Sequence, residues 1–158
     1  MKQRLFGFEM SSSIVLDAPV ERAWEVVVGA NRWPDWAEVC TAAWDAPEKA
    51  EDWKVGHQFG FKLKMAFRDV PFNVTVSRFA PGRLIEWTST KYSITAVRTI
   101  SVVVPGGSGH NPGKCRVEDK KRFSSPFLPV GLAYPRWLIR QMTESWLHDL
   151  KREAESGR

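Results

Sequence analysis

The chain has 158 residues and a mass of 18.0 kDa, a size that favours one compact domain over residues 1–158. Hydrophobic residues make up 43% of the chain and charged residues 26%, which excludes a disordered or collagen-like protein. The net charge of +5 is only mildly basic and its positive residues are dispersed, so nucleic-acid binding is not expected.

The sequence carries no pattern that predicts secretion or membrane insertion. No apolar run follows the positive residues near the N-terminus, and no stretch approaches the roughly 18 apolar residues of a membrane span. Two cysteines, Cys40 and Cys115, agree with a reducing compartment in which a disulfide would not persist. We therefore expect a cytoplasmic protein with two buried, unpaired thiols.

The N-terminal third predicts one strand followed by two short helices. Apolar residues alternate over residues 6–16, as in a strand with one buried face. Asp17 is then expected to cap a helix that ends near Gly29, because an apolar stripe at helical spacing follows it. The segment Asn31-Arg32-Trp33-Pro34-Asp35-Trp36 indicates a second short helical turn, with Pro34 near its start.

The middle of the chain changes to an alternation of period two, with turn residues between short runs, which is typical of an antiparallel meander. Strands are expected at residues 39–44, 57–67, 70–79, 83–89, 94–104 and 114–123. Pro81-Gly82 predicts a tight turn, and the Gly-rich residues 105–113 predict a long hairpin loop.

The C-terminal segment returns to helical spacing, and one long amphipathic helix is expected from about Pro135 onward. Seven antiparallel strands cannot leave one apolar face bare, and this helix is the only large cover available. The expected fold class is therefore α+β, a helix-grip fold in which a curved seven-stranded antiparallel sheet wraps around the C-terminal helix, with two short helices between strands 1 and 2. Space between helix and sheet is a natural ligand cavity.

Several segments resemble a known family. Residues 14–24 (IVLDAPVERAW), followed by Trp33-Pro34-Asp35-Trp36, resemble the opening of the polyketide cyclase/dehydrase and lipid-transport family of the START/Bet v 1-like (SRPBCC) superfamily. Residues 55–59, 81–87 and 150–155 follow in the expected order, so the resemblance covers essentially the whole chain. It implies a helix-grip fold with a hydrophobic cavity for lipids, hormones, polyketides or quinones. Some members of this superfamily are enzymes and many are not.

The strand alternation and the final helix predict which side chains would line such a cavity. Any single Phe or Trp among them could instead belong to the hydrophobic core. The expected ligand-binding residues are Phe59, Phe61, Leu63, Phe72, Val74, Trp87, Ile94, Arg98, Ile100, Trp137 and Met142.

Polar residues on apolar strand faces are the candidates for chemistry. Arg98 lies among the inward residues of the sixth strand, and Asp119 and Lys121 share the inward face of the seventh. Buried charges need partners, so these three are expected to pair and to orient a ligand carboxylate, phenol or carbonyl. The alternative is a bulge that turns all three to solvent. His57 is the only plausible internal base.

Other kinds of site are poorly supported. The Gly-rich residues 106–114 match neither a nucleophile elbow nor a phosphate-binding loop, because the spacing is wrong and a strand follows where a helix is needed. His57, His110 and His148 lack a second metal-binding side chain at ligand spacing. We expect neither a metal nor a cofactor.

Three functions remain open at this point. The leading hypothesis is binding or carriage of a small hydrophobic molecule (a lipid, polyketide, quinone or aromatic compound) in an internal cavity. The alternative is a polyketide aromatase/cyclase-type enzyme, in which Arg98 and Lys121 would polarise a carbonyl. The third is a protein-interaction module, whose mark would be an exposed apolar or basic patch. The oligomeric state is left open.

Overall fold

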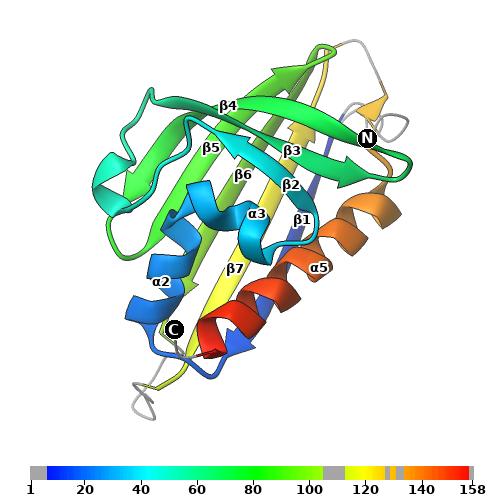
Figure 1. Cartoon of the computed structure of the whole chain (residues 1–158). Coiled ribbons are helices and arrows are strands. Elements are labelled where there is room, and N and C mark those ends of the chain that lie inside the picture. The colour runs from blue at the N-terminus through cyan, green and yellow to red at the C-terminus, as the bar shows by residue number, and fades with distance from the viewer. Residues whose placement is uncertain (1–6, 105–112, 127–128, 131–133, 157–158) are drawn as a thin grey trace.

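The computed structural model describes residues 7–104, 113–126, 129–130 and 134–156 and shows an antiparallel sheet curved around one long helix (Figure 1). The strands are β1 (Gly7–Leu16), β2 (Cys40–Trp44), β3 (Gln58–Met65), β4 (Arg68–Ala80), β5 (Leu84–Lys91), β6 (Ile94–Val103) and β7 (Cys115–Ser124). The helices are α2 (Val20–Val28), α3 (Trp33–Trp36) and α5 (Arg136–Glu155), with short 3-10 helices at Ala30–Arg32 and Ala50–Asp52.

The sheet has seven strands in the order β1-β7-β6-β5-β4-β3-β2, and every neighbouring pair is antiparallel. The register shifts between Cys40 and Ala42 and again between Val76 and Arg78. Such bulges increase local twist and bend the strands, which helps the sheet to curve over α5. The expected helix-grip architecture is thereby confirmed, including the two short helices between β1 and β2.

One close backbone approach in the sheet requires glycine. Gly60 of β3 lies opposite Trp44 of β2, and a Cβ at position 60 would come within 2.1 Å of the Trp44 indole. The Trp44 indole can therefore pack against the backbone of the neighbouring strand only because position 60 has no side chain.

Aromatic side chains fill the space beside α5. The ring of Trp33 lies 5.2 Å from that of Trp87 and 6.2 Å from that of Trp146, so it joins the sheet to α5. Its indole N–H donates to the carbonyl of Val27, and the Trp53 indole donates to the carbonyl of Val28. Two carbonyls in the last turn of α2 are thus satisfied inside the core, as a buried helix end requires.

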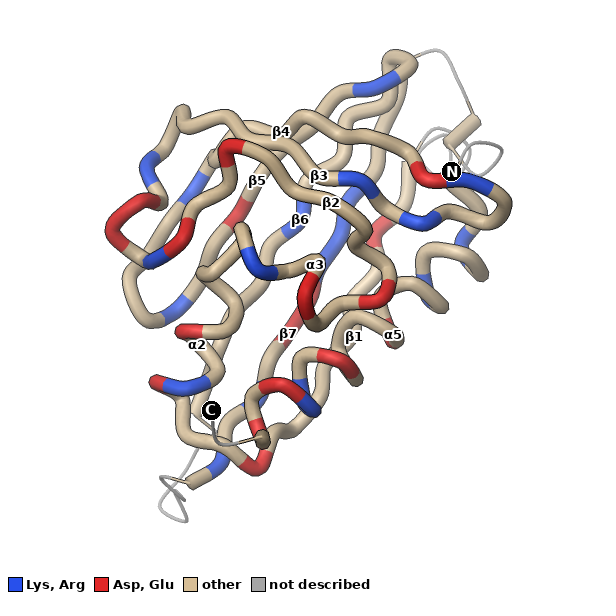
Figure 2. The backbone as a smooth tube through the Cα atoms, viewed as in Figure 1, with Lys and Arg blue, Asp and Glu red and all other residues tan. Residues whose placement is uncertain are grey.

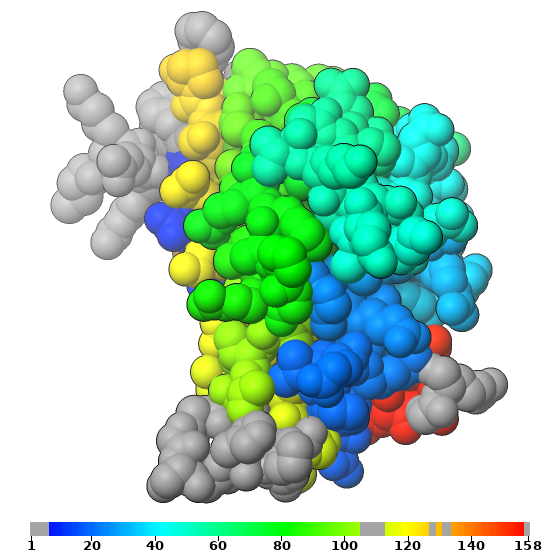
Figure 3. All heavy atoms as spheres, turned by 90° about the vertical axis from the view of Figure 1, so that its left-hand side faces the viewer, coloured from blue at the N-terminus to red at the C-terminus, as the bar shows by residue number. Residues whose placement is uncertain are grey.

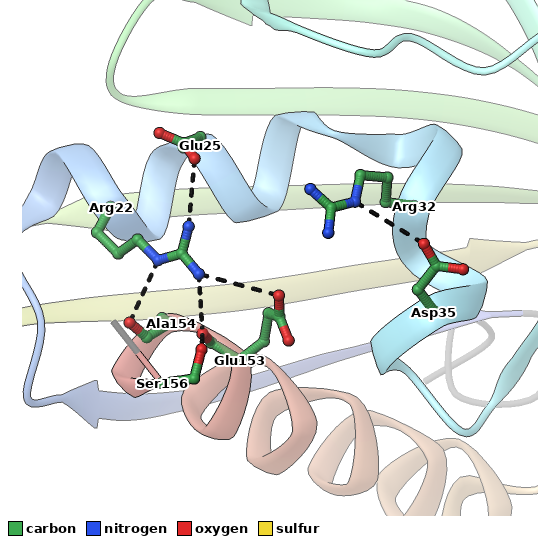
Figure 4. Close-up of polar contacts among 7 residues, drawn as sticks. All are labelled: Arg22, Glu25, Arg32, Asp35, Glu153, Ala154 and Ser156. Carbon is green, nitrogen blue, oxygen red and sulfur yellow. Dashed lines mark hydrogen bonds and ion pairs between the residues drawn. The ribbon is translucent and has the colours of Figure 1, made fainter. Parts of the chain in front are cut away.

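Helix α2 closes one end of the space between sheet and α5. Arg22 donates to the carbonyls of Glu153 and Ala154 at 3.1 and 3.4 Å, which joins α2 to the C-terminal end of α5 (Figure 4). On its other side Trp24 packs on Phe79 with 5.9 Å between ring centres. Figure 3 shows this end of the molecule, where the side chains of α2 (blue) lie against those around the β4–β5 turn (green).

Two local expectations need comment. The prediction that Asp17 caps α2 is wrong, because the helix begins after Pro19 without a side-chain cap. The backbone N–H of Asp17 instead donates to the Glu155 carboxylate at 2.7 Å, which ties the end of β1 to α5. The expected hairpin loop at residues 105–113, with His110, lies outside the described residues except for Gly113.

Charged residues of both signs are spread along the backbone in the view of Figure 2, on helices and strands alike. In the described part of the chain, no helix combines the length and the apolar character needed to cross a membrane.

Candidate ligand-binding site

A pocket of about 80 Å³ lies between the inner face of the sheet and α5. Its wall is formed by β3 to β7 on one side and by α5 on the other. The lining residues are Val39, Phe61, Leu63, Met65, Phe72, Trp87, Ser89, Ala96, Val97, Arg98, Lys121, Phe123, Tyr134, Ile139, Met142 and Trp146.

Strand alternation and helical spacing explain most of this wall. Phe61, Leu63 and Met65 are alternate residues of β3 and therefore share one face. On α5 the lining residues are Ile139, Met142 and Trp146, whose spacings of three and four place them on one stripe toward the sheet. The pocket is thus built by ordinary core positions that do not completely fill the space.

Three charged side chains meet at the pocket wall. Arg98 of β6 donates two hydrogen bonds to the Asp119 carboxylate of β7, from Nε at 3.1 Å and from Nη2 at 2.6 Å. The ammonium of Lys121 lies 3.4 Å from the same carboxylate. Arg98 and Lys121 are directly opposite each other in the β6–β7 register, and Asp119 is two residues away on the same face. The predicted pairing of these residues is therefore present.

The remaining contacts of this cluster come from α5 and from two indoles. Lys121 donates to the Thr143 hydroxyl, which in turn donates to the carbonyl of Ile139 at 2.7 Å. The guanidinium of Arg98 lies 4.6 Å from the ring centre of Trp146 and 5.4 Å from that of Trp87, within the range of cation–π attraction. The cluster thus links the sheet to α5 through both polar and aromatic contacts.

Burial and mutual charge shift the ionisation of the cluster. Burial, followed by repulsion from Arg98, lowers the pKa of Lys121 to about 7, although Asp119 acts in the opposite direction. Burial alone would raise the pKa of Asp119, but the charges and hydrogen bonds of Arg98 and Lys121 hold it below its ordinary value. Asp119 is therefore ionised at neutral pH, whereas Lys121 can gain or lose its proton there.

Six of the eleven expected ligand-binding residues line the pocket: Phe61, Leu63, Phe72, Trp87, Arg98 and Met142. Four others, Phe59, Val74, Ile94 and Ile100, are buried in the core but do not reach the pocket wall. Several lining residues were missed. Ser89 has the parity of Trp87, and Ile139 precedes Met142 by three, so both could have been found from the same periodicities.

Two expected residues lie away from this pocket. Trp137 is 66% exposed and lines a second pocket of about 360 Å³, beside Phe67 and Tyr92 at the tips of the β3–β4 and β5–β6 hairpins. The two pockets share Met65 and Tyr134.

His57 precedes β3, and its Nε2 lies 2.9 Å from the carbonyl of Asp45 outside both pockets. The geometry therefore gives His57 no position from which to act as a base in the pocket.

The thiols of Cys40 and Cys115 are both buried and free, as expected. Burial raises the pKa of Cys40 to about 11 and also raises the pKa of Cys115, so both remain neutral thiols. In the part of the chain that the structure describes, no three His, Cys, Asp or Glu side chains gather as they would to hold a metal ion.

Solved structures with the same fold span nearly the whole chain. A START superfamily protein from Mycobacterium smegmatis has 15% identity and a TM-score of 0.72, over 95% of this chain and 99% of that one. The Zhui aromatase/cyclase from Streptomyces sp. R1128 has 11% identity and a TM-score of 0.76, over 94% of both chains. The major latex-like protein 151 from Panax ginseng has 7% identity and a TM-score of 0.71, over 94% of this chain and 98% of that one.

At these identities the structural likeness establishes the fold alone. No curated protein matches the sequence. The pattern of the family described as polyketide cyclase/dehydrase and lipid transport, however, matches residues 7–155, from the start of β1 to the end of α5. The chain therefore belongs to the polyketide cyclase/dehydrase and lipid transport family.

Proposed function

We propose that this protein binds a small hydrophobic molecule in the pocket between the sheet and α5. The observation that carries the proposal is the chemistry of the wall, which combines aromatic and aliphatic side chains with two buried cationic ones, Arg98 and Lys121. Ligand sites typically have this composition, since apolar area supplies affinity and a few polar groups fix orientation. The fold is also typical of proteins that bind hydrophobic ligands.

The volume of the pocket limits the size of ligand that fits without movement of its side chains. A volume of about 80 Å³ is below the roughly 300 Å³ of a usual small-molecule site. Two of the lining residues are Met65 and Met142, whose unbranched side chains change rotamer more readily than other apolar residues. A ligand of one or two rings therefore enters by displacing these side chains, and the second pocket beyond Met65 and Tyr134 offers the route.

A filled pocket provides the test. Ala96→Leu adds apolar volume at a lining position of β6, and the control Thr90→Leu introduces the same side chain at an exposed position of β5. The probe is 1-naphthalenemethanol, an uncharged two-ring alcohol, titrated against each protein by calorimetry. We expect Ala96→Leu to weaken binding about ten-fold or more, because it occupies the space that the rings need, and Thr90→Leu to leave binding unchanged.

The thermal midpoint of each variant is measured alongside to separate lost binding from lost folding. A folded Ala96→Leu variant that binds as well as the wild type would refute this location for the ligand.

The second candidate function is an aromatase/cyclase-type reaction, and the position of Arg98 and Lys121 at the wall favours it. A folded ligand could present a carbonyl to these donors, which would stabilise negative charge as it develops on the oxygen. Arg98→Met should then abolish cyclisation of a polyketide-like substrate that the variant still binds. Unchanged turnover would remove this role.

A further inference from the structure

We propose that the ligand of this pocket is a hydrophobic acid, a molecule with one anionic group that Arg98 and Lys121 bind together. This inference rests on the proposed function, because it assigns a chemical class to the occupant of the same pocket.

The cluster of Arg98, Lys121 and Asp119 carries more positive than negative charge. Arg98 and Lys121 each carry a positive charge and share one carboxylate, that of Asp119, so the fully ionised cluster has a net charge of +1. Its side chains are almost completely buried, with 13% of Arg98, 13% of Lys121 and none of Asp119 exposed. A buried charge without a partner is costly, and solvent is largely absent here to compensate for it.

No other described residue at the pocket wall supplies the missing negative charge. The lining residues include no aspartate and no glutamate. Tyr134 is the remaining acidic group of the wall, and burial raises its pKa, so it stays a neutral phenol. Cys40 of β2 lies close enough to Arg98 to feel its charge, but it too remains neutral because burial raises its pKa to about 11.

Arg98 and Lys121 also have more hydrogen-bond donors than Asp119 and Thr143 use. A guanidinium has five N–H donors, and Asp119 accepts from two of those of Arg98, the one on Nε and one on Nη2. The Lys121 ammonium has three donors, and its partners within the described residues are Asp119 and Thr143. Both residues therefore retain donors at the pocket wall. A carboxylate, phenolate or enolate can accept these hydrogen bonds and also cancel the excess charge.

The cluster can relieve its excess charge in two ways, and this makes the inference testable. Without ligand, Lys121 loses its proton near neutral pH, as its lowered pKa reflects. With an anion bound, the charge is balanced and Lys121 keeps the proton. Binding of a hydrophobic acid is therefore linked to proton uptake, whereas binding of a neutral analogue is not.

The experiment compares two probes with the same rings, 1-naphthoate and 1-naphthalenemethanol. At about pH 6 we expect naphthoate to bind about ten-fold tighter or more than the alcohol. Its affinity should fall at least about ten-fold by about pH 9, as the protonated fraction of Lys121 declines, while that of the alcohol stays constant. Calorimetry near pH 8 in buffers of different ionisation enthalpy should report uptake of nearly one proton with naphthoate only.

Variants of adjacent lysines provide the matched control. Lys121→Met removes the buried amine but leaves the balanced pair of Arg98 and Asp119, and Lys120→Met removes the same charge from an exposed position on the other face of β7. We expect Lys121→Met to lose the preference for naphthoate over the alcohol and the pH dependence of that preference, and Lys120→Met to behave as wild type.

The outcomes distinguish this inference from the function on which it rests. Equal, pH-independent binding of both probes would overturn the hydrophobic-acid inference and leave the proposed function standing. Failure of both probes to bind would overturn both. Equal losses in the Lys120 and Lys121 variants would assign the preference to general surface charge and overturn the inference. The wild-type pH profile decides the matter even if a variant does not fold.

Discussion

At the scale of single residues, Asp119 is a buried carboxylate held between two cations. It is fully buried and accepts hydrogen bonds from two cations, one on its own strand and one on β6. A buried ion pair is costly to break because removal of one partner leaves the other charge without compensation. The stability of the fold should therefore depend strongly on this carboxylate, whichever ligand the pocket holds.

Asp119→Asn tests this dependence, since it leaves Arg98 and Lys121 without an anion. We expect the free energy of unfolding in urea to fall by about 3–5 kcal/mol. The matched control is Glu118→Gln, which makes the same chemical change at the neighbouring residue, where the carboxylate is about half exposed and pairs with Arg116. That control should cost less than about 1 kcal/mol. Similar losses in the two variants would contradict the importance given to Asp119.

Lys121 makes stability depend on pH in a defined direction. Its pKa is about 7 in the folded protein and near 10.5 in the unfolded chain, so between these values the unfolded chain holds a proton that the folded protein has lost. The free energy of unfolding therefore gains a contribution from this group as pH rises above about 7. Below about 7 both states are protonated, and the cost of burying the charge is complete.

The measurement is urea unfolding of wild type, Lys121→Met and Lys120→Met from about pH 6 to about pH 9. Between about pH 7 and about pH 9 the wild type should gain about 2 kcal/mol relative to Lys121→Met, at up to about 1.4 kcal/mol per pH unit. Lys120→Met should follow the wild type. Parallel curves for all three proteins would show that Lys121 titrates normally.

At the scale of elements, Arg22 fastens α2 to the end of α5. Its side chain is 17% exposed and reaches two carbonyls at the C-terminal end of α5, as well as the carboxylates of Glu25 and Glu153 (Figure 4). These carbonyls belong to the last turn, where the Glu153 carbonyl also accepts hydrogen bonds from the N–H and the hydroxyl of Ser156. The end of the space between sheet and α5 is therefore closed by a specific contact as well as by packing.

Arg22→Ala should lower the free energy of unfolding by about 1–2 kcal/mol and speed hydrogen exchange in the last turn of α5, since the carbonyls lose a charged donor. Arg32→Ala is the control in the same figure. That arginine is 67% exposed and makes only a 3.8 Å ion pair with the exposed Asp35, which is worth less than about 1 kcal/mol. Equal effects of the two variants would argue against a fastening role for Arg22.

The strands and part of the pocket wall could be predicted from the alternation of apolar residues. Alternation located all seven strands, because a half-buried strand must repeat every two residues, and the same parity predicted the meeting of Arg98, Asp119 and Lys121. Alternation could not decide whether Trp137 lines the pocket, because packing determines which helix positions face the sheet. In the structure this ring is exposed and lies beside the second pocket.

Residues outside the strands were harder to predict. Val39 and Tyr134 reach the pocket from just before β2 and α5, and neither was among the expected ligand-binding residues. Asp17 has the composition of a helix cap, yet a long-range contact with Glu155 uses its backbone instead. In each case a tertiary contact prevails over a local preference, and such contacts cannot be inferred from neighbouring residues alone.

At the scale of the whole molecule, the two ends of the space between sheet and α5 differ. Helix α2 and the ring of Trp33 lie toward one end, whereas the second pocket lies at the other, among the hairpin tips and the start of α5. The pocket therefore has a closed end and an end bordered by Met65 and Tyr134. If the proposed ligand is larger than the pocket volume of about 80 Å³, we expect it to enter from the Met65 and Tyr134 end as these side chains move.

The most direct test is a crystal structure of the protein with 1-naphthoate bound. We expect the rings to lie between the residues of β3 to β5 that line the pocket and Met142, with the carboxylate within hydrogen-bonding distance of Arg98 and Lys121. Naphthoate found only against Phe67 and Trp137 in the second pocket, with the inner pocket closed by its own side chains, would contradict this expectation.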